Sequence, residues 1–239
     1  MPVQAHRGAA SEDFRLFAVD QLPVLRIAAA DFCWLLDRDY APRSALEVVG
    51  NRYSLAVRQR MAISRYACSE NEARRRRERT IELAQLRGRE LWVDGYNVLT
   101  LIESALSGGV VLWGRDGCCR DIAGIHRRYR KVSETIPALQ LVGETIAASG
   151  AAGCRWWLDK PVSNSGRLKA AIIEIAKTNR WNCEVEVVFS PDRELSHTNN
   201  PIATSDGIVL DRCRSWVNLA RHIIAERIPG ARVVDLGNG

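Results

Sequence analysis

Three aspartates in this chain could do chemistry together, because each directly follows a predicted strand. They are Asp94, Asp159 and Asp206, and the apolar run before the first is Leu91-Trp92-Val93. Apolar runs of this length that end at a polar turn are typical of buried parallel strands. Parallel strands present their carboxyl ends at one edge of a sheet, where such folds bind ligands. We therefore expect the three carboxylates to converge at one edge.

Carboxylates that converge repel one another unless a cation neutralises them. Oxygen ligands without histidine or cysteine favour Mg²⁺ or Mn²⁺, which activate water and stabilise phosphoryl oxygens in hydrolysis. Asp94, Asp159 and Asp206 are thus predicted metal ligands in a phosphodiester-cleaving site. Asp211 could reach this site directly or through water, and Asn97 could orient a water molecule or a phosphate.

These residues also have a structural interpretation. One aspartate at a strand end is more often a helix cap or a turn former than a ligand. Three such aspartates in one sheet are harder to explain in that way. Asp116, Asp121 and Asp192 are looser candidates, because the sequence does not fix the loops that carry them.

The formal net charge of +6 over 239 residues favours an anionic partner, and nucleic acid is the commonest one. The predicted RNA-binding residues are Arg74, Arg75, Arg76 and Arg77 in an arginine run, Arg127, Arg128 and Arg130 around His126, and Ser163, Asn164, Ser165 and Arg167 at the start of a helix. The arginine run could equally be a solvated helix face. The serines and the asparagine could either hold a phosphate at a helix N-terminus or simply cap the helix.

The seven cysteines are odd in number and form no CxxC pair, which fits a reducing compartment and argues against zinc. The first residues show no charged-then-apolar pattern of a signal sequence, and no apolar run approaches the roughly 18 residues of a membrane span. We expect a cytoplasmic protein without a membrane partner.

Residues 1–88 have a helical pattern and are predicted to form a small all-helical domain. The expected helices begin at Pro23, Ser44, Ser54 and the Ser69–Glu72 capping box, and the last should end near Gly88. From Leu91 onwards strands and helices alternate, so residues 89–239 are predicted to form an α/β domain.

The strands expected in the α/β domain are 91–93, 110–113, 155–158, 184–189, 202–205 and 232–236. The expected helices are 98–106, 136–148, 167–179 and one after Asp206 that carries Trp216 and Ile223. This alternation predicts a mostly parallel sheet covered by helices on both faces, with the last strand closing it.

Two short motifs, Val93-Asp94-Gly95-Tyr96-Asn97 and Thr204-Ser205-Asp206, resemble the NYN branch of the PIN-like ribonuclease superfamily. Residues 44–53, 116–121 and 157–168 more specifically resemble an uncharacterised prokaryotic family, in which a helical N-terminal domain of unknown function precedes a PIN-like domain. The resemblance covers about Leu36 to Leu219.

The resemblance implies a PIN-like three-layer α/β/α fold with a mostly parallel sheet, Mg²⁺ or Mn²⁺, and RNA hydrolysis. It assigns roles to Asp94, Asn97 and Asp206 and extends to Asp211. The usual mid-domain acidic ligand has no clear counterpart, and Asp116, Asp121 or Asp159 could replace it. A homodimer is an expectation by analogy alone.

The sequence therefore predicts a metal-dependent ribonuclease, and the alternative is an RNA-binding protein on the same scaffold with weak or no catalysis. A phosphatase of the haloacid-dehalogenase type would need a second aspartate where this chain has Tyr96. A dinucleotide-binding enzyme would need a GxGxxG motif after the first strand, which is absent.

Overall fold

The computed structural model describes residues 8–122 and 131–237. The helical elements are α1 (Asp13–Leu16), η1 (Val19–Gln21), α2 (Leu22–Leu36), α3 (Pro42–Arg52), α4 (Val57–Tyr66), α5 (Glu70–Glu78), η2 (Leu83–Leu86), α6 (Gly95–Leu106), α7 (Thr135–Ala148), α8 (Ser165–Asn179), α9 (Pro191–His197), α10 (Gly207–Arg212) and α11 (Leu219–Arg227). The strands are β1 (Thr80–Ile81), β2 (Glu90–Asp94), β3 (Val110–Trp113), β4 (Cys119–Asp121), β5 (Gly153–Asp159), β6 (Cys183–Val188), β7 (Ile202–Ala203), β8 (Trp216–Val217) and β9 (Arg232–Asp235).

The largest sheet has six strands in the order β1-β8-β7-β2-β5-β6, and all of its neighbouring strands are parallel. Alternate residues of its strands face opposite layers. Val93 and Leu158 pack towards α6, α7, α8 and α11, whereas Trp92 and Trp157 pack towards α9 and α10. The predicted α/β class, with a mostly parallel sheet and a helical N-terminal region, is confirmed.

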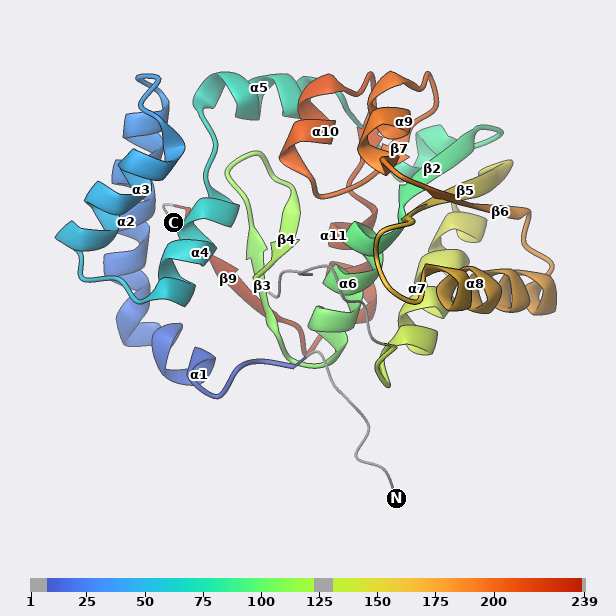
Figure 1. The fold of residues 1–239 in the computed structure, drawn as a ribbon, viewed down its shortest axis with the longest axis horizontal. Helices are drawn as coiled ribbons and strands as arrows, with labels where there is room; N and C mark the ends of the chain where they lie inside the picture. Colours follow the sequence, from blue (N-terminus) through green and yellow to red (C-terminus); the bar gives the residue numbers. More distant parts are fainter. Residues whose placement is uncertain (1–7, 123–130, 238–239) are drawn as a thin grey trace.

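A second sheet has the order β4-β3-β9 and stands apart from the first in Figure 1. The prediction that residues 232–236 close the main sheet was wrong, because β9 pairs in parallel with β3 instead. One face of β3 packs on the α6 layer through Val111. Its other face, with Val110 and Leu112, packs on the N-terminal helices.

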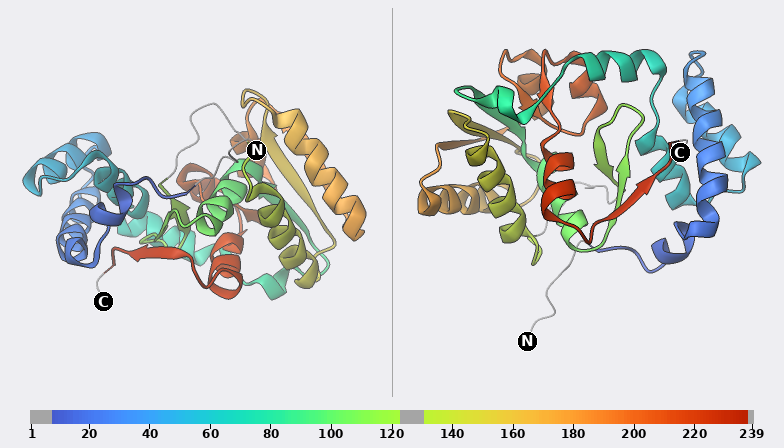
Figure 2. Two further views of the ribbon diagram at one scale, coloured as in Figure 1. Left: turned by 90° about the horizontal axis from the view of Figure 1, so that it is seen from below. Right: turned by 180° about the vertical axis from the view of Figure 1, so that it is seen from behind.

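The helical region, the three-stranded sheet and the six-stranded sheet follow one another across the molecule (Figures 1 and 2). The core of the helical region includes Phe32, Ala62 and Ile63, together with Val234 and Leu236 near the C-terminus. The two ends of the described chain thus share one hydrophobic core. No helix in the described ranges is long and apolar enough to cross a membrane.

Three local predictions need correction. The helix that begins at the Ser69 capping box ends at Glu78 rather than near Gly88, because the β-branched pair Thr80-Ile81 forms an edge strand with Trp216-Val217. The helix predicted after Asp206 is divided by this same pairing into α10 and α11. Helix α4 begins after Ala56 rather than at Ser54.

Candidate functional site

Four carboxylates follow four neighbouring strands of the main sheet. Asp94 ends β2 and Asp159 ends β5, while Asp206 comes three residues after β7 and Asp192 lies in the first turn of α9, just after β6. These strands lie in the order β7-β2-β5-β6 and run parallel. This order and the shared direction place the ends of the four strands at one edge of the sheet. Asp94, Asp159 and Asp206 were predicted there, and Asp192 lies at the same edge.

The turn after β2 places Asp94 close to its neighbours. Gly95 follows it directly, and a Cβ atom there would lie 2.4 Å from Leu158 Cδ2 and 2.9 Å from the Trp157 carbonyl oxygen. Only glycine therefore lets α6 start this close to β5. The Asp-Gly pair brings the first turn of α6 against the end of the neighbouring strand.

Asp94 is the most deeply buried carboxylate of this edge, with 3% of its surface exposed. Thr204 Oγ1 donates a 2.6 Å hydrogen bond to Asp94 Oδ2. Burial raises the pKa of Asp94 to about 7, the Thr204 bond opposes this rise, and the nearby charges of Asp206, Asp192 and Asp159 add to it. A cation beside Asp94 would remove this penalty.

The carboxylates around Asp94 also affect one another. Burial raises the pKa of Asp159, and the charge of Asp192 raises it further. The pKa of Asp192 is raised by partial burial and then by Asp206. Asp206 caps α10, and its Oδ1 accepts the backbone N–H groups of Ile208 and Val209 at 2.7 and 3.2 Å. Within the part of the chain described, its Oδ2 makes no hydrogen bond and is available to a ligand.

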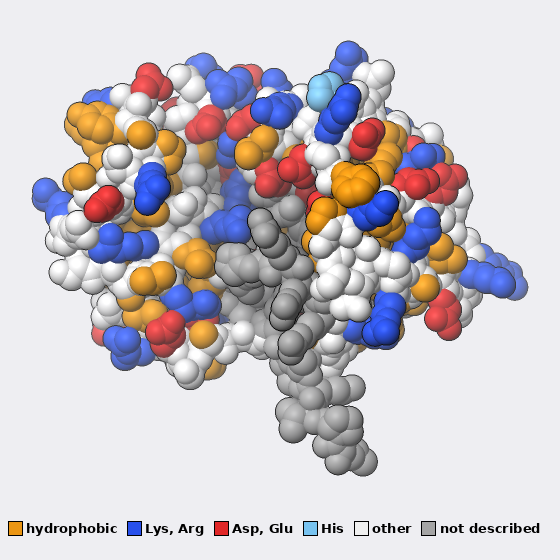
Figure 3. Space-filling view, in the orientation of Figure 1, with side chains coloured by type: hydrophobic (Ala, Val, Ile, Leu, Met, Phe, Trp, Pro, Cys, Tyr) orange, Lys and Arg blue, Asp and Glu red, His pale blue; other side chains and the backbone are white. Residues whose placement is uncertain are grey.

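A polar pocket of about 220 Å³ opens beside Asp94. Its lining residues are Arg65, Tyr96, Asn97, Thr100, Arg120, Asp121, Asp159, Val162, Ser205 and Asp206. Asn97 Oδ1 accepts a 2.7 Å hydrogen bond from Ser205 Oγ, which fixes the amide at the pocket wall. The pocket thus brings together three predicted carboxylates and the predicted asparagine. In Figure 3, acidic and basic side chains lie side by side near the centre of the face.

Asp211 does not line this pocket. Its two oxygens accept hydrogen bonds from Arg76 Nε and Nη2 at 2.8 and 2.7 Å. Arg76 Nη1 also donates to Asp116 at 2.8 Å, and Arg120 binds Asp116 through two further bonds of 2.8 and 2.6 Å. Burial alone would raise the pKa of Asp116, but the two arginines lower it to about 2. Asp116 and Asp211 are therefore paired with arginines and do not line the pocket, although Arg120, a partner of Asp116, does.

The predicted RNA-binding arginines of α5 divide into two groups. Arg76 is buried, with 6% of its surface exposed, in the ion pairs just described. The neighbouring Arg74, Arg75 and Arg77 are exposed, although Arg77 pairs with Glu70 at 2.6 Å. Consecutive residues point in different directions around a helix, so the run cannot present one basic face.

Other predicted RNA contacts lie at the start of α8. Ser163, Asn164 and Arg167 are exposed, and Ser165 is partly buried. Asn164 has a left-handed backbone, with φ of 68°. Arg127, Arg128, Arg130 and His126 lie outside the described residues.

Three residues of the site were not predicted. Thr204 holds Asp94, and it was visible in the sequence only as part of the Thr204-Ser205-Asp206 motif. Arg120 donates its Nε to the Ser205 carbonyl oxygen at 3.0 Å, and Arg65 reaches the pocket from α4 in the helical region. No local pattern could have indicated Arg65, because its place depends on how the helices pack against the second sheet.

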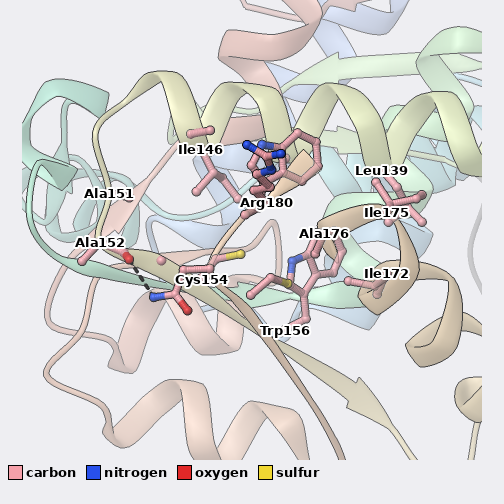
Figure 4. Close-up of a pocket in the computed structure, with 16 residues that line it drawn as sticks. Leu139, Ile146, Ala151, Ala152, Cys154, Trp156, Ile172, Ile175, Ala176 and Arg180 are labelled. Atoms are coloured by element: carbon pink, nitrogen blue, oxygen red, sulfur yellow. Dashed lines mark hydrogen bonds between the residues drawn. The ribbon is translucent and has the colours of Figure 1, made fainter. Parts of the chain in front are cut away.

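A second pocket, of about 210 Å³, lies between α7 and α8 beside the first residues of β5 and β6 (Figure 4). Its walls are mainly apolar, with Ile146, Trp156 and Ile172 among them. It lies at the opposite ends of the strands from the carboxylates, and its described lining contains no carboxylate. Divalent-metal chemistry is therefore better suited to the polar pocket.

The comparisons with known proteins match two consecutive parts of the chain to two families. Residues 83–222 match the family described as Domain of unknown function (DUF5616), and this match spans more than half of the chain. The chain belongs to this family. Residues 24–79 match a second family, described as Protein of unknown function (DUF434).

The chain is also similar to an uncharacterised protein of Methanocaldococcus jannaschii. The two are 29% identical over 183 residues, which cover 77% of this chain and 87% of the relative. No solved structure matches the chain. The predicted resemblance to an uncharacterised prokaryotic family is thereby confirmed.

Proposed function

We propose that this protein is a ribonuclease of PIN-like type that requires Mg²⁺ or Mn²⁺ and hydrolyses RNA phosphodiester bonds. The observation that carries the proposal is the polar pocket, which joins Asp121, Asp159 and Asp206 to an exposed arginine beside the buried Asp94. A phosphodiester brings negative charge into such a pocket. Carboxylates that hold a cation, together with a separate positive charge, can accept the phosphate.

The donors fit a hard divalent ion. Asp94, Asp159 and Asp206 offer oxygen atoms only, and one oxygen of Asp206 has no hydrogen bond within the described chain. In the described ranges, no three His, Cys, Asp or Glu side chains group closely enough to hold a metal by themselves. Mg²⁺ usually keeps several waters and uses one or two carboxylates together with substrate phosphates, so it requires no complete protein cage.

Each side chain has a role in this proposal. A bound Mg²⁺ or Mn²⁺ supplies an activated water molecule and stabilises charge on the phosphoryl oxygens. Thr204 orients Asp94 through its 2.6 Å hydrogen bond. Asn97 is held by Ser205 and can orient water or phosphate without adding charge. Arg65 has no ion pair with any described carboxylate, and its guanidinium is free to bind a phosphate.

The test is cleavage of a panel of structured and single-stranded RNAs, first with Mn²⁺ and then with EDTA. The variants are Asp94→Asn and, as a matched control, Asp39→Asn. Asp39 is exposed and has a left-handed backbone with φ of 59°, which asparagine tolerates well. Cleavage that needs Mn²⁺, persists in the control and is lost in Asp94→Asn is the expected result.

A different result would favour the alternative function. If the wild type and both variants retard RNA equally in a gel and none of them cleaves it, the nuclease proposal fails. The protein is then an RNA-binding protein on this scaffold.

A further inference from the structure

Phe189 is a large apolar side chain left almost fully in solvent, with 73% of its surface exposed. It comes directly after the last residue of β6. Lys160 Nζ lies 4.5 Å from the centre of its ring. The Lys160 backbone N–H donates a 2.7 Å hydrogen bond to the carbonyl oxygen of Val188, so the segments that carry the ring and the ammonium group are tied together.

This pair lies at the edge of the sheet that holds the acidic residues. Asp159 lines the polar pocket, directly precedes Lys160 and pairs in register with Val188, which directly precedes Phe189. Asp192 follows Phe189 by three residues. The ring therefore lies at the same edge of the sheet as the pocket, although neither Phe189 nor Lys160 is among the pocket's lining residues.

The size of the Phe189 ring and the charge of Lys160 indicate what kind of group could bind to this pair. One aromatic side chain offers on the order of 150–250 Å² of surface, far below the roughly 800 Å² that each partner buries in a stable protein interface. That area suits one planar group. Lys160 has no carboxylate partner among the described residues, so the group that stacks here should also carry a negative charge nearby.

We propose that Phe189 and Lys160 form a nucleotide subsite, in which a nucleobase stacks on the Phe189 ring and Lys160 binds the adjoining phosphate. Aromatic rings bind the faces of all four bases, so this contact needs no particular sequence. A base must be unpaired to reach the ring. This inference rests on the proposed function, because it places the subsite beside the bond to be cleaved.

The experiment measures binding of a fluorescein-labelled 12-nucleotide RNA by fluorescence anisotropy, with Ca²⁺ in place of Mn²⁺. The RNA is compared with versions that carry one abasic nucleotide at each position in turn. The proteins are the wild type, Phe189→Ala, Phe189→Trp and the control Phe14→Ala. Phe14 is a close match, since it is 67% exposed and Arg232 Cζ lies 4.8 Å from its ring, but it belongs to α1 at the far end of the molecule (Figure 1).

We expect the loss of affinity caused by removing the Phe189 ring and the loss caused by removing one RNA base to depend on each other. Phe189→Ala should weaken binding of the intact RNA roughly tenfold, within a range of about 5- to 150-fold, and Phe189→Trp should restore it. Removal of one particular base should weaken binding by the wild type to a similar degree but leave the Phe189→Ala affinity unchanged. Phe14→Ala should bind like the wild type.

The proposal is overturned if no abasic position is coupled to Phe189, or if Phe189→Ala and Phe14→Ala bind alike. Either result leaves the ribonuclease proposal standing when the wild type still cleaves RNA with Mn²⁺. Conversely, coupling in a protein that does not cleave supports the subsite while the ribonuclease proposal fails.

Discussion

The buried carboxyl of Asp94 should make this protein less stable as the pH rises. Its pKa of about 7 in the folded chain exceeds the usual value of 3.8, so the folded chain holds a proton that the unfolded chain has released. Stability is therefore lost between about pH 4 and pH 7. A pKa difference of this size corresponds to about 4 kcal/mol at pH 8, a large share of the 5–15 kcal/mol typical of folded proteins.

Replacing Asp94 by asparagine removes the buried charge and keeps an oxygen that can accept the Thr204 hydrogen bond. In EDTA at pH 8, Asp94→Asn should melt roughly 8 to 16 °C above the wild type, whereas at pH 4 the two should melt at nearly the same temperature. Thermal unfolding followed by circular dichroism at both pH values measures this. An exposed control, Asp39→Asn, should follow the wild type at each pH.

Two outcomes would refute this reasoning. If Asp94→Asn melts below the wild type at pH 8, Asp94 stabilises the fold as an anion and its pKa is not raised. If the difference in melting temperature is the same at pH 8 and pH 4, it does not arise from ionisation. Added Mn²⁺ gives a further check, because an ion that binds Asp94 should raise the melting temperature of the wild type and not that of Asp94→Asn.

Two arginines of the helical region give further predictions. Arg76→Ala leaves the buried Asp116 with one arginine fewer and should lower the free energy of unfolding by about 3–5 kcal/mol in urea titrations, whereas the exposed Arg75→Ala on the same helix should change it by less than about 0.5 kcal/mol. Equal effects would show that the buried pair is not stabilising. Arg65→Ala should weaken RNA binding about tenfold and reduce the slope of log K against log salt by about 0.7, while the exposed Arg43→Ala should do neither. An unchanged salt slope would show that Arg65 contacts no phosphate.

The parts of the fold that the sequence predicts well are those in which neighbouring residues decide the structure. The apolar run before Asp94, the glycine after it and the apolar period that follows define a buried strand and a helix within a few residues. The Ser69 capping box is likewise local, since its two partners are three residues apart. Such patterns depend only on residues that are close together in the sequence.

Distant contacts decide the remaining parts. Thr80 and Ile81 continue a helical pattern, but they gain backbone hydrogen bonds by pairing with Trp216 and Val217, which lie far along the chain. Arg76 looked like a surface arginine because all its neighbours are charged. The two carboxylates that it hydrogen-bonds, Asp116 and Asp211, are 40 and 135 residues away, so no short window of sequence contains them.

The buried ion pairs of Arg76 fix the helical region to the part of the chain that carries the pocket. An RNA-binding module joined only by a flexible linker would lack such fixed contacts. Arg65 lies on α4 between Ile63 and Tyr66, which are both buried in the core shared with β3 and β9. Helix α5, which follows, is fixed through Arg76 to Asp116 and Asp211. Two separate sets of contacts thus hold the backbone that carries Arg65, so its guanidinium reaches the pocket from a rigid element. A phosphate bound there would meet an arginine and carboxylates from both parts of the chain, and loosening the helical packing should weaken RNA binding even where no RNA-contacting residue has been changed.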